Sequence, residues 1–99
     1  MSATNGSAQL PSWTLVREEG YLEDRVTLEA VYPRLGVVLD AVEHQFEVLP
    51  DLNSKYLATT AWLYTTPEGV GAPAVHIYYD IDAPTQTVTL MAVHLAGIH

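Results

Sequence analysis

Apolar residues recur at helical spacing over residues 35–49, and this stretch constrains the fold more than any other part of the sequence. Starting at Leu35, apolar residues follow at i+3, i+4, i+7, i+11 and i+14, which predicts an amphipathic helix. Pro50 and Asp51 then end the pattern, because proline cannot continue the ladder of helical hydrogen bonds. A helix with one apolar face must pack against another element. The apolar face comprises Leu35, Val38, Leu39, Val42, Phe46 and Leu49, and most of the opposite face is Arg34, Asp40, Glu43, His44 and Glu47.

A second helix is predicted just before it, over residues 18–32. Glu18 and Glu19 stand near its expected start, where carboxylates interact favourably with the helix dipole. Pro33 ends this helix and can occupy the first turn of the next one. Residues 13–17 alternate between apolar and polar side chains and predict a short strand ahead of both helices. The apolar side of the 18–32 helix is Leu22, Val26, Leu28, Ala30, Val31 and Tyr32.

The C-terminal half changes to the two-residue period of strands. Residues 55–65 predict one central strand, and residues 74–81 and 86–95 predict two more. The short turn between the last two strands predicts an antiparallel hairpin, whereas residues 66–73 are a loop rich in glycine and proline. In the 74–81 strand one face carries Val75, Ile77, Tyr79 and Ile81, and the other carries His76, Tyr78 and Asp80.

The predicted order of elements is therefore β-α-α-β-β-β. Two amphipathic helices bury their apolar faces most economically when they pack together on one face of a sheet. We expect an α+β fold in which two N-terminal helices lie on an antiparallel sheet. Residues 1–10 are small and polar and predict a flexible tail, so that residues 11–99 form a single domain.

Charge and composition exclude several classes of function. Twelve acidic residues stand against four Lys and Arg, which gives a formal net charge of −8 and disfavours general binding of nucleic acid. The absence of cysteine excludes disulfides and thiolate chemistry and fits a cytoplasmic protein. No apolar run is long enough to span a membrane, and the first residues do not resemble a secretory signal.

The order of elements and two segments resemble the RelE/ParE superfamily of small bacterial toxins. The segment from Tyr32 to Val42, with its stop at Leu49-Pro50-Asp51, is similar to the second helix of that family. The segments His76-Ile-Tyr-Tyr-Asp-Ile-Asp82 and Thr87-Val-Thr-Leu-Met-Ala-Val-His94 are similar to its C-terminal hairpin. The resemblance covers about residues 12–95. It implies two helices on a twisted antiparallel sheet, and a toxin that inhibits translation by mRNA cleavage or inhibits DNA gyrase, neutralised by a cognate antitoxin.

The sequence departs from the family where the family carries positive charge. His76 occupies the position of an arginine in the first hairpin strand, and Leu95 occupies the position of the arginine that follows the terminal histidine. Lys55 is the only lysine. In the family, RNA cleavage proceeds by in-line attack of a 2′-hydroxyl and depends on basic side chains that stabilise charge on the phosphate. These departures favour a gyrase-directed toxin or a catalytically silent protein-binding relative over a nuclease.

If the chain does cleave RNA, the candidate acid and base are His76 and His94, assisted by Tyr79. Imidazole titrates near neutral pH, and both histidines lie on the predicted hairpin, where Tyr78 is an alternative to Tyr79. A register in which paired positions have an even sum would place residue 76 opposite 92 and His94 diagonally on the same face, whereas an odd sum would separate the histidines. The alternative interpretation is two ordinary sheet histidines. The candidate phosphate-binding residues are Arg34 and Lys55.

Other constellations are weaker. A zinc site formed by His76, His94, His99 and Asp80 is chemically conceivable, but no close ligand spacing occurs, and we expect neither a metal nor another cofactor. The expected partners are an antitoxin with a basic segment and a target, either ribosome-bound mRNA or gyrase; a homodimer formed through the sheet is a further alternative. We expect the antitoxin segment to be basic because it would pair with an acidic surface.

Overall fold

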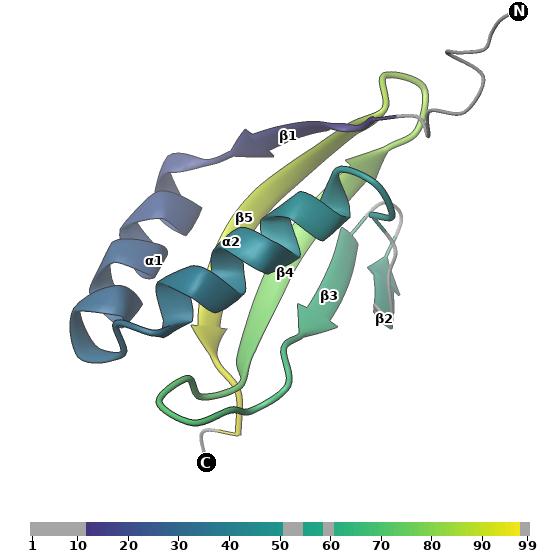
Figure 1. Cartoon of the computed structure of the whole chain (residues 1–99). Helices are drawn as coiled ribbons and strands as arrows, with labels where there is room; N and C mark the ends of the chain where they lie inside the picture. Colours follow the sequence, from purple (N-terminus) through teal and green to yellow (C-terminus); the bar gives the residue numbers. More distant parts are fainter. Residues whose placement is uncertain (1–11, 51–54, 59–60, 98–99) are drawn as a thin grey trace, which may run out of the picture.

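The computed structural model describes residues 12–50, 55–58 and 61–97, and for residues 55–58 it describes the backbone. These residues form two helices and five strands. The predicted order β-α-α-β-β-β is confirmed, with the second predicted strand, residues 55–65, divided in two. The elements are β1 (Thr14–Arg17), α1 (Glu19–Val31), α2 (Leu35–Phe46), β2 (Lys55–Ala58), β3 (Ala61–Thr65), β4 (Val75–Asp82) and β5 (Thr87–Leu95). Figure 1 shows α2 in front of the sheet and α1 to one side, next to β5.

The strands form one sheet in the order β1-β5-β4-β3-β2. All neighbours are antiparallel except β1 and β5, which run parallel, so the sheet is mixed rather than purely antiparallel as expected. β1 is followed by two helices rather than by a tight turn, so the strand that pairs with it is determined by tertiary packing. The local sequence pattern therefore cannot predict that β1 pairs with β5. Figure 1 shows β1 at one edge beside β5 and β2 at the opposite edge.

The prediction of a single strand over residues 55–65 is corrected by the antiparallel pairing of β2 with β3. Tyr56 pairs with Trp62, and Ala58 pairs with Ala61. The two residues between these strands are Thr59 and Thr60, and threonine is a strand-forming residue rather than a turn former. The sequence therefore carried no signal for a reversal at this point.

The β4–β5 hairpin contains a β-bulge that changes the register along its length. Tyr78 pairs with Ala92, but Tyr79 pairs with Leu90, so Met91 is the extra residue of β5. The bulge keeps apolar side chains inward on both sides of it, because the apolar phase of β5 changes from Leu90 to Val93 at the same place. On the side of the bulge that holds the histidines, paired positions have an even sum.

The core lies between the helices and the sheet. Phe46 of α2 packs against Tyr79 with ring centroids 4.5 Å apart and against the edge of Tyr64 at 5.8 Å. Each large apolar side chain buried here contributes roughly 1.5–3 kcal/mol to the free energy of unfolding. The buried apolar residues are Tyr21, Leu35, Leu39, Val42, Phe46, Ala72, Val75, Ile77, Tyr79, Val88, Leu90 and Val93.

Candidate functional site

The predicted histidines meet on the face of the sheet that the helices leave open. Val75, Ile77 and Tyr79 of β4 are buried beneath the helices, so the alternation of a strand places His76 and Tyr78 on the opposite face. His76 pairs directly with His94 of β5. The two histidines therefore share a face, and they are direct neighbours rather than the diagonal neighbours expected for an even register.

Tyr78 lies beside both imidazole rings. Its ring centroid is 6.4 Å from that of His76 and 5.7 Å from that of His94. The arrangement is a cluster of three rings on two adjacent strands, with the tyrosine next along β4 from His76. These are groups that can exchange protons, and they are placed by strand pairing alone.

The two imidazoles have polar neighbours on opposite sides of the pair. Nδ1 of His76 is 2.8 Å from Oγ1 of Thr65, which lies on β3. Nε2 of His94 is 3.5 Å from Oδ2 of Asp24, which lies on α1 beyond the other edge of β5. The same Asp24 oxygen accepts a 3.2 Å hydrogen bond from the backbone N–H of Val93. Each histidine therefore has a partner of its own, and the two imidazole nitrogens that contact these partners do not face a common site between the rings.

Tyr79, the tyrosine predicted to assist the histidines, is buried in the core. Its hydroxyl donates a 2.6 Å hydrogen bond to the backbone carbonyl of Pro50. Its ring packs against Phe46, on the far side of the sheet from His76 and His94. Strand alternation is the physical reason, and it makes Tyr78 the tyrosine that accompanies the histidines.

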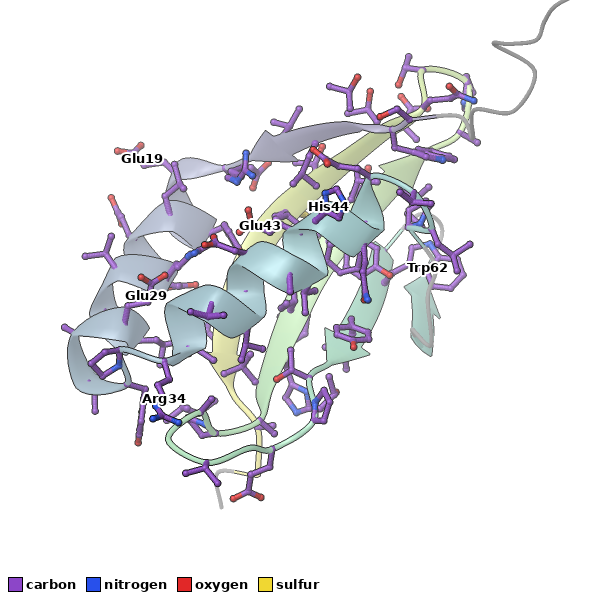
Figure 2. The ribbon with its side chains drawn as sticks, viewed as in Figure 1. Glu19, Glu29, Arg34, Glu43, His44 and Trp62 are labelled. Atoms are coloured by element: carbon purple, nitrogen blue, oxygen red, sulfur yellow. The ribbon has the colours of Figure 1, made fainter. Side chains whose placement is uncertain are left out.

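A buried carboxylate binds two of the three arginines in the chain. Glu43 projects from α2 toward α1 (Figure 2) and its side chain is 5% exposed. Nε and Nη2 of Arg17 lie 2.8 and 2.6 Å from Oε1 of Glu43, and Nη1 of Arg25 lies 2.5 Å from Oε2. The Tyr21 hydroxyl donates a further 2.5 Å hydrogen bond to Oε2. One carboxylate therefore joins β1, α1 and α2.

Arg25 has further acceptors. Its Nε donates to Glu29, and its Nη2 donates to Asp40 at 2.5 Å and to the carbonyl of Gly36 at 3.1 Å. Burial by itself lowers the pKa of Arg25, but the bonds to Asp40 and Glu29 outweigh it and raise the pKa above its ordinary value. The guanidinium is fully charged and all of its nitrogens are engaged within the protein.

Burial also raises the pKa of the Tyr21 hydroxyl well above its ordinary value. The hydrogen bond to Glu43 and the negative charge of that carboxylate raise it further. Tyr21 is therefore a neutral hydrogen-bond donor at physiological pH. Glu43 was predicted to lie on the polar face of its helix, but it is buried. It follows Leu39 by four residues, and this spacing was the available signal for its burial.

Of the two predicted phosphate-binding residues, Arg34 lies away from the histidines, and the structure describes only the backbone of Lys55. Arg34 directly precedes α2 and belongs to the helix layer, near the loop between β3 and β4 (Figure 2). A Cβ at Gly71 would lie 2.9 Å from Cδ of Arg34, so the arginine stem passes over this glycine. Lys55 begins β2 and pairs with Leu63, and its side chain lies outside the described residues, as does His99.

Over residues 12–50, 55–58 and 61–97 there is no group of three His, Cys, Asp or Glu side chains placed to hold a metal ion. Within the same residues, neither helix is long and apolar enough to cross a membrane.

The fold has a counterpart among solved structures. A chain in the crystal structure of the toxin–antitoxin complex RelBE2 from Mycobacterium tuberculosis superposes with a TM-score of 0.65. The two chains are 17% identical, and the match covers 85% of this protein and 98% of that chain. No protein-family model and no curated protein matches the sequence. The likeness extends over nearly the whole domain and establishes a shared fold.

Proposed function

We propose that this protein is the toxin of a bacterial toxin–antitoxin pair and that it inhibits its target, DNA gyrase, by binding rather than by cleaving RNA. A cognate antitoxin would neutralise it. The fold shared with a chain of the RelBE2 complex supports the toxin–antitoxin assignment. The resemblance of its second helix and C-terminal hairpin to the RelE/ParE superfamily supports the assignment as toxin.

The proposed mechanism rests on one observation: Arg17 and Arg25 both form ion pairs with Glu43. In-line attack on a phosphodiester requires cations that stabilise the developing negative charge. Both arginines instead hold a buried carboxylate in place, and Arg25 has two further acidic partners. A protein that commits these cations to its own carboxylates is poorly equipped to hold an RNA backbone.

The test begins with inducible expression of the full chain in a bacterium. We expect growth arrest, inhibition of DNA supercoiling by purified gyrase, and intact mRNA in an in vitro translation reaction. Normal growth with a high yield of folded protein would reject the toxin and favour a catalytically silent protein-binding module. Growth arrest accompanied by mRNA cleavage would reject the binding mechanism.

A second candidate function, mRNA cleavage, is favoured by the direct pairing of His76 with His94 beside Tyr78. His76 and His94 would act as acid and base, with Tyr78 rather than Tyr79 assisting and with Arg34 and Lys55 binding phosphate. This function requires that His76→Ala and His94→Ala each abolish inhibition of translation. His44→Ala is the matched control, because His44 is an exposed histidine on α2, away from the open face.

A further inference from the structure

The outer face of α1 exposes apolar side chains that no other part of the described structure covers. Leu22 is 44% exposed and Val26 is 71% exposed, and they lie one helical turn apart. They border a groove of about 360 Å³ that is completed by Glu19, Glu23 and Thr27. Figure 2 shows Glu19 at the start of α1, pointing away from α2 and the sheet.

This face is exposed because the opposite side of α1 makes the contacts with the rest of the fold. Tyr21 and Arg25 bind Glu43 of α2, and Asp24 binds the edge of β5. The helix is thereby fixed in one rotational setting. The apolar pair at Leu22 and Val26 cannot turn inward without breaking these contacts.

The carboxylates around the apolar pair have no cationic partner among the described side chains. In the part of the chain that the structure describes, Glu18, Glu19 and Glu23 form no ion pair, whereas Glu29 and Glu43 are both bound by arginine. The apolar stripe therefore lies within a local surplus of negative charge. Such a surface attracts positively charged segments and repels acidic ones.

We propose that the groove on α1, lined by Glu19, Leu22, Glu23, Val26 and Thr27, binds a basic amphipathic segment of a partner protein. Apolar side chains of the segment would cover Leu22 and Val26, and its Lys or Arg side chains would pair with Glu19 and Glu23. This proposal rests on the proposed function in one respect: the partner of that chemistry is the antitoxin. A second copy of the chain does not fit, since the same carboxylates would then face one another.

The first experiment uses the full chain and a synthetic amphipathic helical peptide that carries Leu on one face and Lys on both flanks. Binding is measured by fluorescence anisotropy and mapped by NMR amide shifts. We expect saturable binding that weakens as salt concentration rises, with the largest shifts in α1. No saturation up to about 1 mM peptide, or shifts confined to other elements, would overturn the proposal.

Substitutions then test whether the peptide binds to the groove or simply to any acidic surface of the protein. Val26→Ser and Glu23→Lys should each weaken peptide binding about tenfold. The matched controls are Val70→Ser and Glu68→Lys, which change an exposed apolar and an acidic residue of the β3–β4 loop and should leave binding unchanged. Circular dichroism confirms that each variant is folded. Equal losses in test and control variants would overturn the proposal, as would a dimer of the chain that Val26→Ser dissolves.

The growth assay distinguishes failure of the groove proposal from failure of the proposed toxin function. Growth arrest without peptide binding would reject the groove and leave the toxin assignment standing. Groove-dependent peptide binding without growth arrest would support the groove and reject the toxin.

Discussion

The hydroxyl of Tyr21 on α1 donates a 2.5 Å hydrogen bond to the carboxylate of Glu43 on α2, and both residues are buried. The same carboxylate receives Arg17 from β1 and Arg25 from α1. Three elements that are separated in sequence thus meet at one acidic side chain. Because a buried charge is costly when it lacks partners, the Glu43 carboxylate is tolerated in the core only while these donors hold it.

Replacing Glu43 with alanine should lower the free energy of unfolding by about 3 kcal/mol. The substitution leaves the Tyr21 hydroxyl without its acceptor and removes the buried acceptor that Arg17 and Arg25 share. Urea denaturation at neutral pH measures the change. The control is Glu47→Ala, a more exposed glutamate just after α2, which should change the value by less than about 0.5 kcal/mol. Equal stability of the two variants would show that the network contributes nothing.

Replacing Tyr21 with phenylalanine should cost about 1.5 kcal/mol at neutral pH, since a hydrogen bond to a charged acceptor is lost. It should also change the dependence of stability on pH. The folded protein raises the pKa of Tyr21 above the unfolded value of about 10, so its contribution is complete below about pH 10 and is lost as pH rises further. Between about pH 9 and pH 11 the parent protein should therefore lose about 1 kcal/mol more than Tyr21→Phe. Parallel losses in urea titrations at both pH values would contradict this.

Tyr78 and Tyr79 are adjacent in sequence but should respond differently to loss of the hydroxyl. Tyr79→Phe leaves the carbonyl of Pro50 without its donor in the core and should destabilise the protein by about 1–2 kcal/mol. Tyr78→Phe alters the open face and should change stability by less than about 0.5 kcal/mol. Thermal unfolding followed by circular dichroism compares them. A greater loss for Tyr78→Phe would refute the assignment of Tyr79 to the core.

Two glycines of the β3–β4 loop form another matched pair. Gly71 has a φ of +74°, and a Cβ there would lie 2.9 Å from Cδ of Arg34, so Gly71→Ala should destabilise by about 1–2 kcal/mol. Gly69 has no atom within 4 Å of an added Cβ, and Gly69→Ala should be close to neutral. Denaturation midpoints of the two variants provide the measurement. Similar midpoints would indicate that the loop adapts to either side chain.

Local periodicity was sufficient for most of the fold. The helical spacing from Leu35 onward predicted α2, and the alternation of residues 74–81 predicted β4 with its faces correctly assigned. That alternation also placed Tyr79 with Val75 and Ile77, so its burial was readable from the sequence. These features depend on neighbours within a few residues, whose relative directions are fixed by backbone geometry.

Contacts between distant segments were decided by the tertiary structure alone. The parallel pairing of β1 with β5 and the bulge at Met91, which sets His76 opposite His94, depend on how whole elements pack. The capture of two arginines by Glu43 likewise depends on α1 and α2 meeting at one rotational setting. The sequence determined which residues could form helices, strands and ion pairs. Only packing determined which of them meet, because burial and long-range pairing are properties of the whole chain and not of any short stretch of it.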